Sequence, residues 1–466
     1  MTMRRLGLAL IWVCVLAAVA YAAIVSVGGE SAQAPEGAGE PGGRQDDEAV
    51  VLRFMYWGSE AEKEALERMV AAFNESRPGI RVVTEHILSD NNSYISRLQS
   101  LLAANDLPDI AYMPELVLEW GEQGRLLDFT PYLDDFPAFK DRLPVSLLYA
   151  EPGKLLGSTT AGEIITMFYN REAFRRAGLS DPPAEAARAW TWEEFVRVAK
   201  RLTIDEAGRS ADEAGFDPDR IAQYGVSFPM NWGTWMPLVA SNGGALTDEA
   251  GMSFLLDRPE AEEVFQALKD LVYVHRVAPG VQKQIGMPGT AERLRSGEVA
   301  MAIDGQWSLL DVASTPGLAY GMAVLPKFKE PKTMFLAGAT SIFATTKHPE
   351  AALEFYAYHN DPRRVDLYEK GLWMPIENAY YNDPAAIASW IDNPFHPPEY
   401  RTAALDYLRE HAIRSPSLSV RNWTAIERTL SPILDKIWTD EAPVPDVLRE
   451  AREAVEPLLQ GKYPTE

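Results

Sequence analysis

Tryptophans and carboxylates follow several predicted strands of this 466-residue chain, and together such side chains can bind a polyhydroxyl ligand. An indole ring covers the apolar face of a sugar ring, and a carboxylate accepts strong hydrogen bonds from hydroxyl groups. The clearest case is RSGEVAMAIDGQW, residues 295–307, where Gly297 ends a helix and a short buried strand follows. A turn at Asp304 and Gly305 then places Trp307 just past that strand. Ligand crevices of open α/β sheets lie at such strand ends, so this segment predicts a pocket wall.

Other predicted strand ends carry similar side chains. Trp57 and Gly58 end the first predicted strand, and the stretch NWGTW begins with Asn231 and Trp232 directly after another one. Glu115 follows the third predicted strand. For each indole the alternative is packing against the following helix. We therefore treat all five as candidate ligand contacts.

Composition excludes several classes of function. The formal charge is −23, from 44 basic and 67 acidic residues, and it would repel nucleic acid. The only cysteine, Cys14, lies in an N-terminal apolar run, so the folded part can form no intramolecular disulfide. The six histidines are scattered, and neither HExxH nor GxSxG occurs. The sequence thus predicts no metal and no cofactor, and it singles out no catalytic residue.

The N-terminus predicts export. Arg4 and Arg5 precede an apolar stretch that contains an A-x-A cleavage signal ending at Ala22. Residues 1–27 are therefore a signal peptide, or an uncleaved membrane anchor, since about twenty apolar residues also span a bilayer. Residues 28–48 are rich in Gly, Ala, Glu and Pro, which predicts a flexible linker.

From residue 49 onward, strand-like and helix-like patterns alternate, which is typical of an α/β protein. Residues 60–76 form the clearest amphipathic helix, and the chain after residue 348 is mostly helical. A chain of this length exceeds one hydrophobic core. We expect two α/β lobes with mostly parallel sheets flanked by helices, and a helical C-terminal tail.

Eight motifs occur in an order that resembles the extracellular solute-binding proteins of ABC importers, in the sugar-binding group that includes maltose-binding protein. Any one of them is weak evidence, because helix caps and strand ends favour such residues anyway. The eight are FNESRPGIRV (73–82), LPDIAYM (107–113), GRLLDFTPYL (124–133), FYNREAFRRAGL (168–179), TWEEF (191–195), SNGG (241–244), the segment 295–307 and HPEAALEFY (348–356).

The resemblance implies a two-lobed periplasmic-binding-protein-like fold of type II, with the ligand between the lobes and closure about a hinge. The implied segments are 49–160 and 339–395 for the first lobe, and 161–338 and 396–466 for the second. The chain would cross between the lobes near residues 158–163, 338–340 and 393–398.

The resemblance also assigns candidate contacts. Glu163, with Thr160 nearby, falls at the first crossing, where the family has a sugar-binding carboxylate. Trp232 matches an aromatic contact of the family, and Trp373 lies in a region that the family uses near the cleft. Alternatives remain: Glu163 as a solvated hinge charge, and Asp304 as a turn residue with a local role.

The function implied is a non-enzymatic, monomeric receptor that binds a sugar, specifically an oligosaccharide, and delivers it to ABC permease subunits in the membrane. It would act in the periplasm or on the outer face of the cytoplasmic membrane. The strand ends carry no arginine fork and no P-loop glycine pattern, which favours a neutral ligand over a phosphate. Two alternatives stay open: the same fold binding glycerol phosphate, a polyamine or another solute, and a secreted glycoside hydrolase.

Overall fold

The computed structural model describes residues 49–88, 91–114 and 116–466. The predicted signal segment 1–27, the linker 28–48 and the candidate Glu115 lie outside the described residues. No helix in the part that is described has both the length and the apolar character needed to cross a membrane.

The predicted amphipathic helix is confirmed as α2 (Glu60–Ser76). Ser59 caps it: the Glu62 amide donates to the Ser59 hydroxyl at 3.3 Å, and the Glu62 carboxylate accepts from the Ser59 amide at 2.7 Å. This reciprocal capping box fixes where the helix begins. The apolar face is buried through Leu66, Met69, Val70 and Phe73.

The first sheet has the strand order β12-β3-β1-β2. Its strands are β1 (Val50–Trp57), β2 (Ile80–Ile87), β3 (Ile110–Met113) and β12 (Ala339–Ile342). Strand β1 runs parallel to β2 and β3, as expected, whereas β12 runs antiparallel to β3. Because β1 and β3 point the same way, Trp57 and the residues after Met113 come to the same edge.

The second sheet has the order β13-β11-β6-β9-β8-β7, and β10 also pairs with β6. Its strands are β6 (Glu163–Asn170), β7 (Ile204–Asp205), β8 (Ile221–Ser227), β9 (Val299–Gly305), β10 (Tyr320–Ala323), β11 (Thr333–Leu336) and β13 (Ala412–Arg414). This sheet is mixed rather than mostly parallel, since β6 runs antiparallel to β9, β10 and β11. Strand β6 follows β5 (Lys154–Ser158) after only four residues, 159–162, so no helical crossover precedes it.

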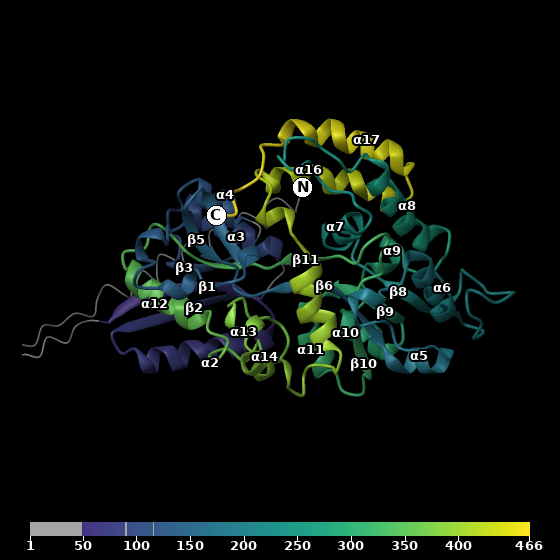
Figure 1. The fold of residues 1–466 in the computed structure, drawn as a ribbon, viewed down its shortest axis with the longest axis horizontal. Helices are drawn as coiled ribbons and strands as arrows, with labels where there is room; N and C mark the ends of the chain where they lie inside the picture. Colours follow the sequence, from purple (N-terminus) through teal and green to yellow (C-terminus); the bar gives the residue numbers. More distant parts are fainter. Residues whose placement is uncertain (1–48, 89–90, 115) are drawn as a thin grey trace, which may run out of the picture. The chain divides into compact units, whose positions relative to one another are not determined.

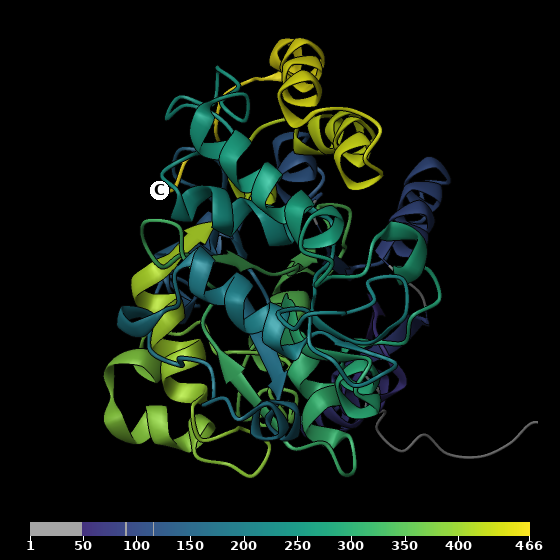
Figure 2. The same ribbon diagram turned by 90° about the vertical axis from the view of Figure 1, so that its right-hand side faces the viewer.

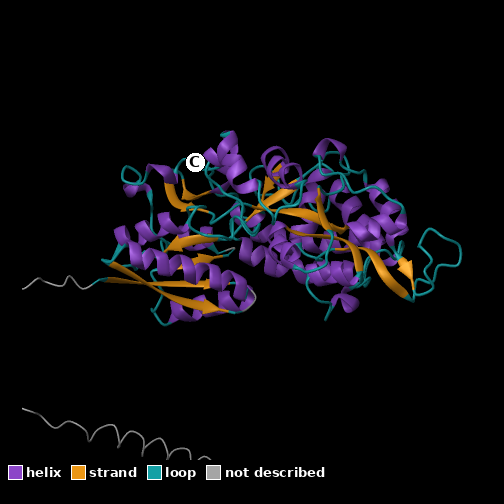
Figure 3. Cartoon of the chain, turned by 90° about the horizontal axis from the view of Figure 1, so that it is seen from below, coloured by secondary structure: helices purple, strands orange, loops and turns teal. Residues whose placement is uncertain are grey.

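Helices surround both groups of strands (Figures 1, 2 and 3). Near the first sheet are α2, α3 (Asn91–Ala103), α4 (Val117–Glu122) and α12 (Pro349–His359), followed along the chain by α13 (Ala379–Asn382) and α14 (Pro384–Ile391). The other helices are α5 (Arg171–Ala177), α6 (Trp192–Leu202), α7 (Trp232–Ser241), α8 (Pro259–Tyr273), α9 (Val281–Gln284), α10 (Thr290–Ser296), α11 (Leu309–Ser314), α15 (Tyr407–His411), α16 (Trp423–Trp438) and α17 (Val444–Val455).

Some local predictions differ from the structure. Within the part after residue 348 that the sequence predicts to be mostly helical, Arg401–Asp406 is a π-helical segment followed by the short α15. Strands β11 and β13, and the hairpin of β4 (Leu147–Glu151) and β5 (Lys154–Ser158), were not predicted. These strands are short and lack a clear alternation of polar and apolar residues, so sequence periodicity carries little signal for them.

Two segments run side by side, one entering the second sheet from the separate β4–β5 hairpin and one leaving it for the first sheet. Residues 159–162 lead from β5 to β6, and residues 337–338 lead from β11 back to β12. The Thr160 amide donates to the Gly338 carbonyl at 2.9 Å, and the hydroxyls of Thr160 and Thr340 lie 2.8 Å apart. The two connections are therefore hydrogen-bonded to each other where they pass between the sheets.

Candidate functional site

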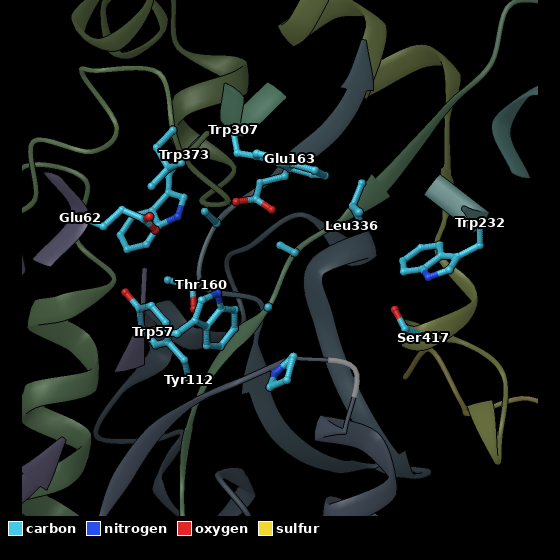
Figure 4. Close-up of a pocket in the computed structure, with 15 residues that line it drawn as sticks. Trp57, Glu62, Tyr112, Thr160, Glu163, Trp232, Trp307, Leu336, Trp373 and Ser417 are labelled. Carbon is cyan, nitrogen blue, oxygen red and sulfur yellow. The ribbon is translucent and has the colours of Figure 1, made fainter. Parts of the chain in front are cut away.

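A cavity of about 400 Å³ lies where these connections meet the strand ends (Figure 4). Side chains from elements of both sheets line it. They are Trp57, Glu62, Tyr112, Pro114, Thr160, Ala161, Glu163, Trp232, Trp307, Leu336, Ala337, Gly338, Leu372, Trp373 and Ser417.

The wall on the side of the first sheet is a packed aromatic cluster. The ring of Trp57 lies 5.4 Å from that of Tyr112, edge to face, and Trp373 lies 6.3 Å from Tyr112. The Tyr112 hydroxyl is 3.1 Å from His359 Nε2. Burial lowers the pKa of His359 to about 3, so this imidazole is neutral at ordinary pH. The cluster thus presents fixed apolar faces to the cavity.

The wall on the side of the second sheet follows from strand register. Strand β6 begins at Glu163, which pairs with Leu336 at the end of antiparallel β11. On the other side of β6, Ile165 pairs with Gly305 at the end of antiparallel β9. The start of β6 therefore lies beside the ends of β9 and β11, and this places Glu163, Leu336 and Trp307 at one edge.

Gly305 allows Trp307 to take its position. A Cβ atom on Gly305 would lie 2.1 Å from atoms of the Trp307 indole, which is far too close. The residue between them, Gln306, is buried, and its amide donates to the Gly371 carbonyl. The turn is anchored by Gln306, while the indole folds back over Gly305 toward the cavity.

Two carboxyl groups lie on the cavity, one from each side. Burial, and then the charge of Glu62, raise the pKa of Glu163 to about 8. Burial also raises the pKa of Glu62, against the opposing effect of its hydrogen bonds with Ser59. Among the described residues none hydrogen-bonds to the Glu163 carboxyl, which Figure 4 shows directed into the cavity. This group is free to bond a ligand.

The cavity has no positive counterpart to these acids. No lysine, arginine or histidine occurs among the described residues that line it. Within the same part of the chain, no group of three or more His, Cys, Asp or Glu side chains could hold a metal ion. The available chemistry is therefore stacking on indoles and hydrogen bonding to carboxyl and hydroxyl groups.

Trp232 and Ser417 form the far end of the cavity, away from Trp57 and Trp373 (Figure 4). Trp232 is the first residue of α7, and its ring packs edge-on against Trp423 at 5.7 Å. The cavity is thus longer than a single stacking site.

Several candidates from the sequence do not line the cavity. The Asp304 carboxylate accepts from the hydroxyls of Ser308, at 2.8 Å, and Thr290. Asn231 caps α7 by accepting from the Gly233 amide at 3.0 Å. Gly58 lies against the Glu62 side chain, and Gly305 lies against the Trp307 indole. In each case a Cβ atom on the glycine would clash with that side chain. We therefore leave Asp304 and Asn231 out of the proposed contacts.

The family model for bacterial extracellular solute-binding proteins matches residues 57–362, which is more than half of the chain. The chain belongs to this family. An arabinooligosaccharide-binding protein of Halalkalibacterium halodurans is 27% identical over 373 residues, covering 72% of this chain and 76% of the relative. An sn-glycerol-3-phosphate-binding periplasmic protein of Brucella abortus is 26% identical over 288 residues, 60% of each chain.

Solved structures confirm the two-lobed α/β fold of this solute-binding protein. An ABC substrate-binding protein from Listeria monocytogenes, in complex with cycloalternan, has a TM-score of 0.74 and 21% identity, covering 88% of this chain and 99% of its own. A maltose/maltodextrin-binding domain from Bdellovibrio bacteriovorus, bound to maltotriose, has a TM-score of 0.69 and 19% identity with the same coverage.

Sequence reasoning missed two notable lining residues of this solute-binding protein. Glu62 carries a signal, because the capping-box pattern from Ser59 to Glu62 directly follows the first strand. Because the capping role alone accounts for a glutamate at position 62, the sequence gives no sign that this side chain also lines the cavity. Tyr112 lies inside the uniformly buried strand β3, where no alternation shows which residue faces a cavity.

Proposed function

We propose that this solute-binding protein binds a sugar, specifically an oligosaccharide, between its lobes and delivers it to the membrane subunits of an ABC transporter. The observation that carries the proposal is the grouping of Trp57, Trp307 and Trp373 with the carboxyl groups of Glu62 and Glu163 around one cavity. Indole faces fit the apolar faces of sugar rings, and carboxyl groups bond their hydroxyls. Its volume falls in the usual range for small-molecule sites.

The charges of the lining residues argue for a neutral or basic ligand. The charge of Glu62 already raises the pKa of Glu163, and an anionic ligand would bring a further negative charge beside Glu62 with no lysine or arginine among the described lining residues. A phosphate site ordinarily supplies arginine or lysine donors. The preference named for the Brucella relative, sn-glycerol-3-phosphate, is therefore a poor match to this cavity.

We propose hinge closure as the mechanism of capture. The paired connections 159–162 and 337–338, with a third crossing near 393–398, would act as the hinge between segments 49–160 with 339–395 and segments 161–338 with 396–466. Closing would bring Glu163 and Trp307 into contact with a ligand already bound to the aromatic cluster on the side of the first sheet. The binding free energy would then shift the population toward the closed state.

We further propose that the protein is exported, with residues 1–27 as signal peptide or anchor and 28–48 as linker, and that it acts as a monomer. It binds its ligand without catalysis, as the names of the relatives suggest. The test of a hydrolytic alternative is simple: release of chromophore from aryl glycosides at a rate above buffer would contradict a pure receptor.

The decisive experiment is a binding panel on the full-length protein. Arabino-, malto-, xylo- and gluco-oligosaccharides are compared with sn-glycerol-3-phosphate and spermidine by thermal shift and tryptophan fluorescence. We expect at least one oligosaccharide to raise Tm and change the fluorescence, and the anion to do neither. Failure of every sugar, or a preference for the phosphate or the polyamine, would contradict the proposal. Mass spectrometry of ligand released on denaturation identifies the natural solute.

A further inference from the structure

Two carboxylates of α4 contact the N-terminal end of α16 and the C-terminal segment. The Thr424 amide donates to Glu119 Oε1 at 2.9 Å. The Glu122 carboxylate accepts from the Arg421 guanidinium and from the Tyr463 hydroxyl, the latter at 3.0 Å. We call Glu119, Glu122, Arg421, Thr424 and Tyr463 the latch.

Helix α16 does not supply its own N-terminal cap. Asn422, at the cap position, has φ 60° and makes no capping bond, because its side-chain amide donates to the Leu458 carbonyl at 2.9 Å. The first amides of a helix need acceptors, and its N-terminal end favours negative charge. Glu119 meets both needs from another part of the fold.

The latch joins elements that belong to different sheets. Helix α4 directly follows β3 of the first sheet and packs on β4. Helix α16 packs on α8 and α17, and α8 packs on α7, which contacts β6, β9 and β11 of the second sheet. Arg421 and Tyr463 stay together on the α16 side, with the guanidinium 4.5 Å from the Tyr463 ring centre.

The latch lies beside one end of the cavity and does not line it. Pro114, a lining residue, comes shortly before α4, and Ser417 comes shortly before Arg421. Trp423, the first residue of α16, packs against Trp232 of the cavity wall. A movement that separates α4 from α16 would therefore open this end of the cavity.

We propose that the latch holds the two lobes closed, so that breaking it opens the cavity and weakens binding without removing any ligand contact. This inference rests on the hinge closure proposed above. Glu122 and Arg421 are 45% and 23% exposed, so dissolved salt can screen their attraction. The fraction of closed molecules should then fall as the ionic strength rises.

The test measures closure directly, with and without ligand. Spin labels are attached to cysteines introduced at the exposed positions Glu75 and Arg197, one on α2 and one on α6, in a full-length Cys14→Ser background. In Glu119→Gln/Glu122→Gln we expect the ratio of closed to open molecules to fall by about 3- to 10-fold. The affinity for the sugar found in the panel should fall in proportion to the fraction of closed molecules in the free protein. Salt should weaken closure in the parent protein and have little effect in the double variant.

The matched control is Glu450→Gln. It breaks the 2.7 Å ion pair between Lys436 and Glu450, which joins α16 to α17 within one side of the molecule at similar exposure. This variant should leave closure and affinity unchanged. The exchange Glu122→Arg with Arg421→Glu should restore part of the closure that either change alone removes. Thermal unfolding confirms that each variant is folded.

The outcomes separate the latch from the proposed function. If a sugar binds and the double variant shows parental label distances and affinity, the latch is wrong and the sugar receptor stands. If no sugar binds but the double variant loses closed molecules, the latch stands and the proposed ligand is wrong. An equal effect of Glu450→Gln would also overturn the latch, because the loss would then follow from charge removal anywhere on α16 and α17.

Discussion

The two walls of the cavity are built differently. On the first side, Trp373 is 5% exposed, and its ring contacts those of Tyr112, His359 and Tyr368. On the second side, Trp307 is only half-buried and has no aromatic ring contact among the described residues. Trp373 belongs to the buried hydrophobic core, whereas Trp307 packs against that core from a turn. Stability and affinity should therefore depend on different tryptophans.

The largest expected effect is that of Trp373→Ala on folding. Removing a buried indole leaves a cavity inside the aromatic cluster, so we expect the free energy of unfolding to fall by about 3–5 kcal/mol. Urea denaturation followed by circular dichroism measures it. A loss below about 1 kcal/mol would show that Trp373 contributes no more to stability than Trp307, and the two walls would then not differ in this respect.

Glu163 should make stability depend on pH. Its pKa rises from an ordinary 4.5 to about 8 in the folded protein, so between these values the unfolded chain loses a proton that the folded chain keeps. Stability is then greatest near and below pH 4.5 for this group and falls as pH rises toward 8, by at most about 1.4 kcal/mol per pH unit. Urea midpoints across this range, compared with those of Glu163→Gln, measure the difference. Identical pH profiles would contradict the burial of this carboxyl.

Trp307→Ala should separate affinity from stability. The indole faces the cavity and is only partly buried where it packs against the core, so we expect binding of the panel's sugar to weaken by about 2 kcal/mol, roughly 30-fold. The free energy of unfolding should fall by about 1 kcal/mol, well below the loss in Trp373→Ala. Isothermal titration and urea denaturation are run on the same preparation. If the variant instead unfolds and its folded fraction binds normally, Trp307 is a core residue like Trp373.

The smallest effect is expected at Asp304. An asparagine at this position can still accept hydrogen bonds from the hydroxyls of Ser308 and Thr290. Asp304→Asn should therefore change affinity by less than about twofold and the free energy of unfolding by about 1 kcal/mol. Titration beside Trp307→Ala provides the comparison. A loss of affinity as large as that of Trp307→Ala would mean that Asp304 contacts the ligand directly.

Strand ends were informative because their geometry is local. The patterns that end at Trp57 and Trp307 fix the position of each indole relative to its own strand, and both line the cavity. The same patterns could not show which polar groups already have partners. Asn231 and Asp304 also stand at strand or helix ends, yet a nearby amide and two hydroxyls take up their hydrogen bonds.

Contacts between segments far apart in the chain could not be predicted from the sequence. No spacing pairs Glu119 with Thr424, or brings Glu62 to the cavity that Glu163 enters. The antiparallel pairing of β6 with β9, β10 and β11 likewise joins segments far apart in the sequence. Trp373 and Glu163 were found only through the resemblance, because neither stands in a pattern with a local explanation.

The position of β12 bears on how the protein is made. The first sheet is completed on the β3 side only by β12, Ala339–Ile342, which follows the strands β6 to β11 of the second sheet in the sequence. During synthesis β3 therefore lacks this partner until most of the chain exists, and long-range pairing of this kind forms slowly. The first sheet therefore reaches its full strand order only after the strands β6 to β11 have been synthesised.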